Sequence, residues 1–162
     1  MLQYATMTGD VRLLEACVAS AAALDYPVFD HSEWPDAEPA PKGSTALVVC
    51  CAHLAMETWL AKRGHRPRTS DDEEQDERTS KMVECAILLV KLGADFHRNF
   101  ILGPPSEACG LLLSWYRTAR IDGKTAQQLA QMAQKPELVK AMKGLQSEEQ
   151  RIALVYCRCG SR

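Results

Sequence analysis

Hydrophobic and polar residues follow a helical pattern most clearly from Lys81 to Asn99. The apolar positions recur at i, i+1, i+3, i+4 and i+7, a spacing that lines one face of a helix. Gly93 follows directly, and glycine accepts the left-handed backbone that ends many helices. The pattern therefore predicts a helix that ends at Gly93, followed by a turn from which Phe96 leads away. The apolar positions are Cys85, Ala86, Leu88, Leu89 and Leu92.

Two other stretches carry the same spacing, Gly9 to Asp25 and Pro136 to Met142. Because a single helix pair cannot bury its own apolar face, recurring copies indicate units that stack on one another. Thr8-Gly9-Asp10 is predicted to be a turn between two antiparallel helices that span Met1 to about Ala22. The residues at the inward-facing positions of the two copies are Leu13, Leu14, Ala16 and Cys17, then Leu138, Val139, Ala141 and Met142.

A second motif precedes these helices, at Gly43 to Cys50 and at Gly123 to Ala130, and Met1 to Ala5 enters it partway through. Together the two motifs resemble those of the ankyrin-repeat family, roughly G-x-T-P-L-H-x-A for the first helix and E-V-V-K-L-L-L-x-x-G-A-D-V-N for the second. The resemblance implies an all-α fold, a short ankyrin-repeat solenoid of stacked antiparallel helix pairs.

The motifs also depart from the family pattern. Alanine replaces the proline at Ala46 and Ala126, and the histidine is replaced at Val48 and Gln128. In the family that histidine ties neighbouring repeats together by hydrogen bonds. We therefore expect an irregular solenoid of about three to four repeats, with long inserted loops.

The predicted repeat domain spans residues 1–145, with insertions at about 26–42 and 64–80. A helix that opens at Thr45 is expected to run to about Arg63 and to end at Gly64. The acidic run 71–77 follows a cluster of Lys and Arg, and such blocks are usually solvated and mobile. The alternative is an electrostatic docking strip for a basic partner, whose attraction would weaken with salt.

The insertion at 26–42 is rich in proline and acidic residues but also holds Tyr26, Phe29 and Trp34. These aromatic side chains either pack onto their own repeat or form a binding finger, since large side chains on a scaffolded loop are favoured interface anchors. Both alternatives remain open.

Residues 100–121 carry no clear motif. We expect a helix there that contributes Leu111, Leu112, Trp115 and Tyr116, with Trp115 and Tyr116 in the core. The last helix pair, Asp122 to about Leu145, is predicted to cap the array with an outward polar face. That face would be made of Gln127, Gln128, Gln131 and Gln134.

The tail, residues 146–162, ends with Cys157 and Cys159. Residues 155–160 resemble the start of a MYND-type zinc finger, and these two cysteines are the candidate zinc ligands. A structural zinc site needs four ligands, so we expect zinc only if such a module is completed beyond this sequence. An ordinary tail is the alternative.

Composition excludes several classes of function. The net charge of −2 lacks the basic excess that phosphate-backbone binding needs, so we expect no nucleic-acid partner. We find no signal-peptide pattern and no apolar stretch of membrane-spanning length, and we expect no membrane partner. Seven cysteines without the spacing of a disulfide framework fit free thiols in a reducing compartment, cytoplasmic or nuclear. Cys17, Cys50 and Cys85 are expected to be packing residues.

Catalytic motifs are absent from the sequence. Cys50, His53 and Glu57 share one predicted helical face, but packing explains Cys50 more simply than nucleophilic catalysis. The sequence thus favours a non-enzymatic scaffold that binds a partner protein through hairpin loops and the concave face. We expect the scaffold to be a monomer. The alternative is a targeting or regulatory segment of a larger protein with a MYND-type module. The predicted contact residues are Tyr26, Phe29, Trp34, His97, Arg98 and Phe100.

Overall fold

The computed structural model describes residues 1–20, 24–25, 44–64, 72–101 and 115–159 of the 162-residue chain, with the side chains of 72–74 and 149–159 left aside. In this part of the chain the regular secondary structure is helical, apart from one isolated antiparallel β-bridge between Asn99 and Thr125. The helices are α1 (Leu2–Thr8), α2 (Val11–Ala19), α3 (Ala46–Lys62), α4 (Asp72–Lys91), α6 (Ala126–Met132) and α7 (Pro136–Cys159). The all-α prediction is confirmed.

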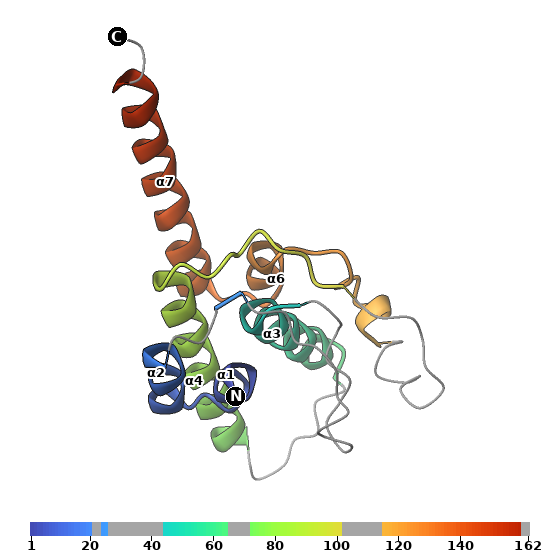
Figure 1. Cartoon of the computed structure of the whole chain (residues 1–162). Helices are drawn as coiled ribbons and strands as arrows, with labels where there is room; N and C mark the ends of the chain where they lie inside the picture. Colours follow the sequence, from blue (N-terminus) through green and yellow to red (C-terminus); the bar gives the residue numbers. More distant parts are fainter. Residues whose placement is uncertain (21–23, 26–43, 65–71, 102–114, 160–162) are drawn as a thin grey trace.

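The helices form consecutive pairs, α1 with α2, α3 with α4, and α6 with α7. The first members of the pairs contact one another in the order α1, α3, α6, and the second members in the order α2, α4, α7. Figure 1 shows α3 between α1 and α6, with α4 on the side of α2 and α7. Segments far apart in the sequence therefore lie in two adjoining rows of helices.

Local signals end α1 and start α2, α3 and α6 where the sequence predicts. Gly9 adopts a left-handed backbone (φ +72°) at the end of α1, and Asp10 caps α2 by accepting the Leu13 N–H at 2.9 Å. Thr45 caps α3, and its hydroxyl accepts the Val48 N–H at 3.4 Å. Thr125 and Gln128 cap α6 reciprocally, which satisfies two backbone donors at once.

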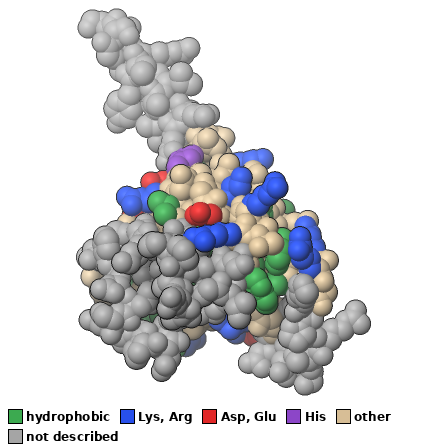
Figure 2. All heavy atoms as spheres, turned by 90° about the vertical axis from the view of Figure 1, so that its right-hand side faces the viewer, with side chains coloured by type: hydrophobic (Ala, Val, Ile, Leu, Met, Phe, Trp, Pro, Cys, Tyr) green, Lys and Arg blue, Asp and Glu red, His purple; other side chains and the backbone are tan. Residues whose placement is uncertain are grey.

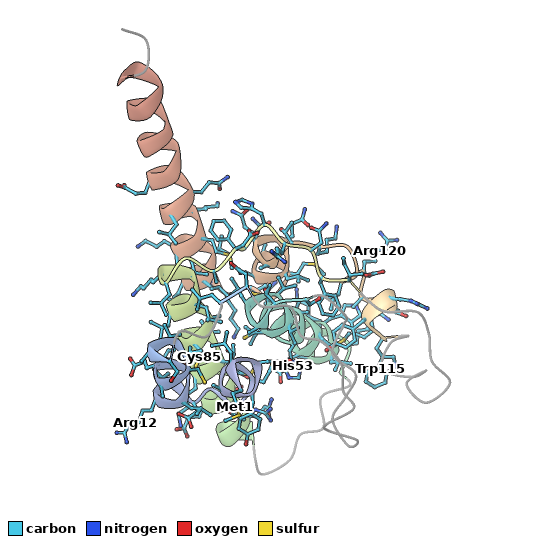
Figure 3. The ribbon with its side chains drawn as sticks, in the orientation of Figure 1. Met1, Arg12, His53, Cys85, Trp115 and Arg120 are labelled. Atoms are coloured by element: carbon cyan, nitrogen blue, oxygen red, sulfur yellow. The ribbon has the colours of Figure 1, made fainter. Side chains whose placement is uncertain are left out.

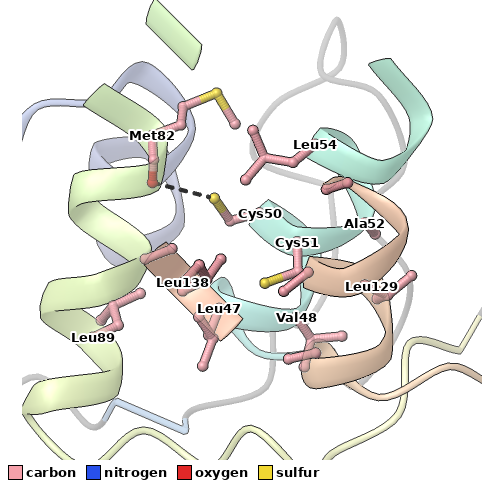
Figure 4. Packing of buried hydrophobic residues seen from close by; sticks show 14 of the residues in the cluster. Leu47, Val48, Cys50, Cys51, Ala52, Leu54, Met82, Leu89, Leu129 and Leu138 are labelled. Atoms are coloured by element: carbon pink, nitrogen blue, oxygen red, sulfur yellow. Dashed lines mark hydrogen bonds between the residues drawn. The ribbon is translucent and has the colours of Figure 1, made fainter. Parts of the chain in front are cut away.

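Helix α3 lies at the centre of the core. Its residues from Ala46 to Ala52 are buried, as are Leu54 to Met56, because the first two turns of α3 are apolar on all sides and other helices cover them. Figure 4 shows side chains of α3 between those of α4 and α6. The side chains buried at the positions predicted from the repeat pattern are Leu14, Cys85, Ala86, Leu89, Leu138 and Met142. Ala16 and Leu92, also predicted to lie on the apolar face, are exposed.

Helix α4 differs from the prediction for the acidic run. The sequence favoured a solvated, mobile block within the insertion at 64–80. Asp72 to Ser80 instead form the first part of α4, on which Asp76, Glu77 and Arg78 are exposed, as predicted for a solvated run. Negative side chains at a helix N-terminus interact favourably with the helix dipole. Contacts of Gln75 and Thr79 with Glu57 of α3 also hold this part of the helix in place. The insertion between α3 and α4 is therefore shorter than predicted.

The C-terminal helix is also longer than expected. We predicted that the last repeat helix would end near Leu145, but α7 continues to Cys159. In Figure 1 its later turns extend away from the other helices. The predicted boundary between the repeat domain and the tail therefore falls inside one continuous helix.

Residues 115–118 form a single helical turn. Trp115, predicted to be a core residue, is 42% exposed, because the neighbouring residue Tyr116 packs against the core at this turn. Tyr116 is partly buried there and stacks on Phe100 with ring centroids 5.5 Å apart. Leu111 and Leu112, predicted for the same helix, lie outside the described residues.

Candidate functional site

The turns that lead out of one helix pair and into the next are joined by hydrogen bonds. The side-chain Oδ1 of Asp25, after α2, accepts the backbone N–H of Asp95, after α4, at 2.9 Å. The Phe100 N–H donates to the Lys124 carbonyl at 2.8 Å, and the Gly123 N–H donates to the Phe100 carbonyl at 2.8 Å. These hydrogen bonds connect three turns that are far apart in the sequence.

Asp95 organises the middle turn. Besides the link to Asp25, its Oδ1 accepts the N–H of His97 at 2.9 Å, and its Oδ2 pairs with Arg98 Nε at 3.5 Å. Phe96 is buried beneath the turn, and its ring centroid lies 4.4 Å from that of His97. Buried Phe96 and the Asp95 carboxylate thus hold the turn in place, while His97 and Arg98 are exposed.

Some of the predicted contact residues are exposed in the structure and one is buried. His97 and Arg98 lie at the surface, as a partner contact requires. Phe100 does not: it is 2% exposed, since the paired turns and Tyr116 enclose it. Phe100 is therefore a core residue and its prediction as a contact is corrected. Tyr26, Phe29 and Trp34 lie outside the described residues.

Two surface residues beside these turns were missed by the sequence analysis. Ile101 is 56% exposed directly after buried Phe100, and Arg120 is exposed in a left-handed backbone conformation (φ 56°). The sequence gives one indication of the exposure of Ile101, namely that a large apolar residue stands in a segment between helices. We define the turn surface by four exposed residues, His97, Arg98, Ile101 and Arg120.

Trp115 and Arg120 lie on the same side of the molecule, where Figure 3 labels them. Figure 2 views this side and shows Lys and Arg side chains spread over it, with few acidic side chains between them. Arginine and large apolar side chains are enriched among residues that dominate binding energy at protein interfaces. The composition of the turn surface is therefore suited to contact with another protein.

A polar cluster lies between α3 and α4. The Glu57 carboxylate interacts with His53 Nε2 at 3.1 Å and accepts hydrogen bonds from Gln75 Nε2 at 2.6 Å and Thr79 Oγ1 at 3.2 Å. Burial alone would raise the pKa of Glu57. The hydrogen bonds from His53 and Thr79, with the positive charges of His53 and Arg78, outweigh burial and lower the pKa. The cluster anchors the first part of α4.

The cysteines of the core are packed as small apolar residues. Cys50 is buried and its thiol donates to the Met82 carbonyl at 3.7 Å, the contact drawn in Figure 4. Burial raises the pKa of Cys50 well above its ordinary value, raises that of Cys51 to about 12, and raises that of Cys85 to about 11. Thiols with such pKa values are poor nucleophiles at neutral pH. Cys17 is only partly buried.

No match to this chain was found among known protein families, curated proteins or solved structures.

The described residues carry neither a group of metal ligands nor a membrane-spanning helix. Within that part of the chain, no three His, Cys, Asp or Glu side chains are grouped so as to hold a metal ion. No helix there is long and apolar enough to cross a membrane. Helix α7 includes both Cys157 and Cys159, whose side chains lie outside the described set. The zinc module stays a prediction from the sequence.

Proposed function

We propose that this chain is a non-enzymatic protein-interaction module of the ankyrin type, which binds a partner protein through the turn surface and the adjoining first helices. The observation that carries the proposal is the hydrogen bonding between the turns. Hydrogen bonds from the Asp95 N–H to the Asp25 carboxylate and from the Phe100 N–H to the Lys124 carbonyl link the exits and entries of successive helix pairs. Together with the two rows of helices, they support a stack of repeats.

The surface chemistry supports binding rather than catalysis. Arg98 and Ile101 are exposed on turns whose backbone is fixed by hydrogen bonds and a buried aromatic residue. A surface held rigid before binding loses less conformational entropy when a partner docks. In the proposed mode, Ile101 supplies an apolar anchor, and Arg98 and Arg120 supply charged contacts around it. The expected partner is another protein in a reducing compartment, not a nucleic acid.

The test compares affinity capture from the source cell by the unchanged chain, by Ile101→Asp and by Arg98→Ala. Arg12→Ala is the matched control, because Arg12 is exposed on α2, away from the turn surface. Loss of an interface anchor commonly costs about 2 kcal/mol, so a specific partner should fall by about tenfold or more in the Ile101→Asp sample. Equal recovery of every captured protein by all four chains would overturn the proposal.

The insertion at 26–42 needs its own variant, since it supplies the other predicted contacts. Trp34→Ala is expected to weaken capture of the same partner while leaving the melting temperature unchanged. A large fall in melting temperature would instead assign Trp34 to the core. A result of that kind would remove the finger from the proposal and leave the turn surface untouched.

A further inference from the structure

A groove of about 440 Å³ lies between the middle of α4 and the start of α7. Its apolar lining consists of Val83 and Ile87, on successive turns of α4. Asp76, Thr79 and Ser80 of its lining belong to the part of α4 that precedes the repeat pattern, and Lys135 belongs to the turn that precedes α7. Its volume falls within the range of roughly 300–1,000 Å³ that is typical of ligand pockets, enough to take a large apolar side chain.

Charges around the groove are unbalanced. Glu84 of α4 and Glu137 of α7 line it, against the single lining cation Lys135, while Asp76, which also lines it, is engaged in an interaction of its own. Glu84 and Glu137 are exposed, while Lys135 is half-buried. Lys81, which follows the groove-lining Ser80, is paired with Glu77 at 2.7 Å, so its charge is already compensated. The described rim therefore carries a net negative charge next to an apolar floor.

We propose that this groove docks a basic segment of a partner protein, in which one apolar side chain enters the floor and flanking Lys or Arg side chains face the rim carboxylates. Charge complementarity selects this occupant: an acidic segment would meet the exposed carboxylates of Glu84 and Glu137, and a purely polar one would leave the partly exposed Ile87 uncovered. Electrostatic attraction of this kind increases the association rate and specificity more than the affinity. Individual contacts of this kind should be weak and salt-dependent.

The groove shares no residue with the turn surface, so it extends the proposed interaction function to a second face of the protein. Its chemistry also differs, because the turn surface presents arginine and isoleucine whereas the groove presents carboxylates. The two faces can therefore bind different segments of one partner, or two partners. Each can be tested while the other is intact.

The probe is the capped peptide acetyl-Lys-Arg-Leu-Lys-Arg-amide, titrated into the isotopically labelled full chain and followed by amide NMR shifts. Saturable shifts are expected for Thr79, Val83, Ile87, Lys135 and Glu137, and they should weaken as salt is raised. A peptide with serine in place of leucine should bind several-fold more weakly, and one with Glu and Asp in place of Lys and Arg should not bind. Absence of saturable shifts, or shifts that lie mainly outside the groove, would overturn the proposal.

Charge reversal supplies the decisive variant. Glu84→Lys is expected to weaken peptide binding by at least about threefold, given the modest contribution of an exposed charge. Glu15→Lys, the same charge reversal at an exposed position of α2, should leave binding unaltered. Equal binding by both variants refutes docking in the groove. Arg98→Ala should bind the peptide normally, so loss of partner capture through the turn surface and failure of the groove are distinguishable results.

Discussion

The N–H of Asp95 donates a 2.9 Å hydrogen bond to Oδ1 of Asp25, which lies 70 residues earlier in the chain. The two residues follow equivalent helices, α2 and α4, in successive pairs. This one contact joins the exit turn of the first pair to that of the second. It also fixes the carboxylate-bearing turn that presents His97 and Arg98.

Replacing Asp25 with alanine should destabilise the fold by about 1–3 kcal/mol, because the partly buried Asp95 N–H would lose its acceptor. Asp25→Asn keeps a side-chain carbonyl oxygen and should recover at least half of that loss. Urea denaturation of the two variants measures the difference. Equal destabilisation by both would show that charge, and not the hydrogen bond, is what Asp25 contributes.

Gly9 should tolerate alanine less well than Gly123 does. Both have a left-handed backbone, with φ of +72° and +75°, so both substitutions carry strain of about 1 kcal/mol. A Cβ at Gly9 would also lie 2.5 Å from the Lys81 Cβ, whereas one at Gly123 meets nothing within 4 Å. We expect Gly9→Ala to cost about 1–3 kcal/mol more than Gly123→Ala in urea denaturation. Equal costs would contradict this close approach of the first turn to α4.

Gln134 offers the opposite test, since it adopts φ 54° without being glycine. Gln134→Gly should stabilise the protein by roughly 0.5–1 kcal/mol by relieving that strain. Gln131→Gly, the same change one turn earlier inside α6, should instead destabilise it by about 0.5–1 kcal/mol. Thermal melting of the pair gives the sign of each effect, and a shared sign would refute the left-handed assignment at Gln134.

Glu57 should give the fold an acid-sensitive component of stability. Its folded-state pKa is lowered from the ordinary 4.5, so the carboxylate stabilises the fold above that pH and the contribution is lost as pH falls through the folded-state pKa. Glu57→Gln should be less stable than the unchanged protein at pH 5.5, with a gap that narrows on acidification below pH 4.5. Urea midpoints between pH 5.5 and 3 measure the gap. Glu15→Gln, at an exposed position, is the control, and a gap for Glu57→Gln that stays constant with pH would contradict the cluster.

Thiol labelling should separate the described cysteines by burial. In a chain with serine at positions 109, 157 and 159, we expect native protein to react at Cys17 alone. Cys50, Cys51 and Cys85 are buried and have raised pKa values, so they should react only after unfolding. Mass spectrometry of labelled protein counts the modified sites. Rapid labelling of Cys50 in the folded state would revive the nucleophile hypothesis that the packing disfavours.

The sequence by itself determined where most helices begin and end. Thr45 and Asp10 cap helices through hydrogen bonds to residues three positions later, and Gly9 ends one through its own backbone freedom. These interactions are local, so a pattern of a few residues suffices to predict them. The helical periodicity of Leu138 and Met142 likewise predicted their burial.

Tertiary structure decided what local patterns leave open. Phe100 is buried because its turn pairs with Lys124 and its ring meets Tyr116, while Ile101 beside it remains exposed. The acidic run became the first part of α4, where Glu57 from another helix accepts hydrogen bonds from Gln75 and Thr79. Local patterns set helix propensity and ends, but the burial of a side chain between helices depends on contacts with residues distant in the sequence, and only the folded arrangement brings those together.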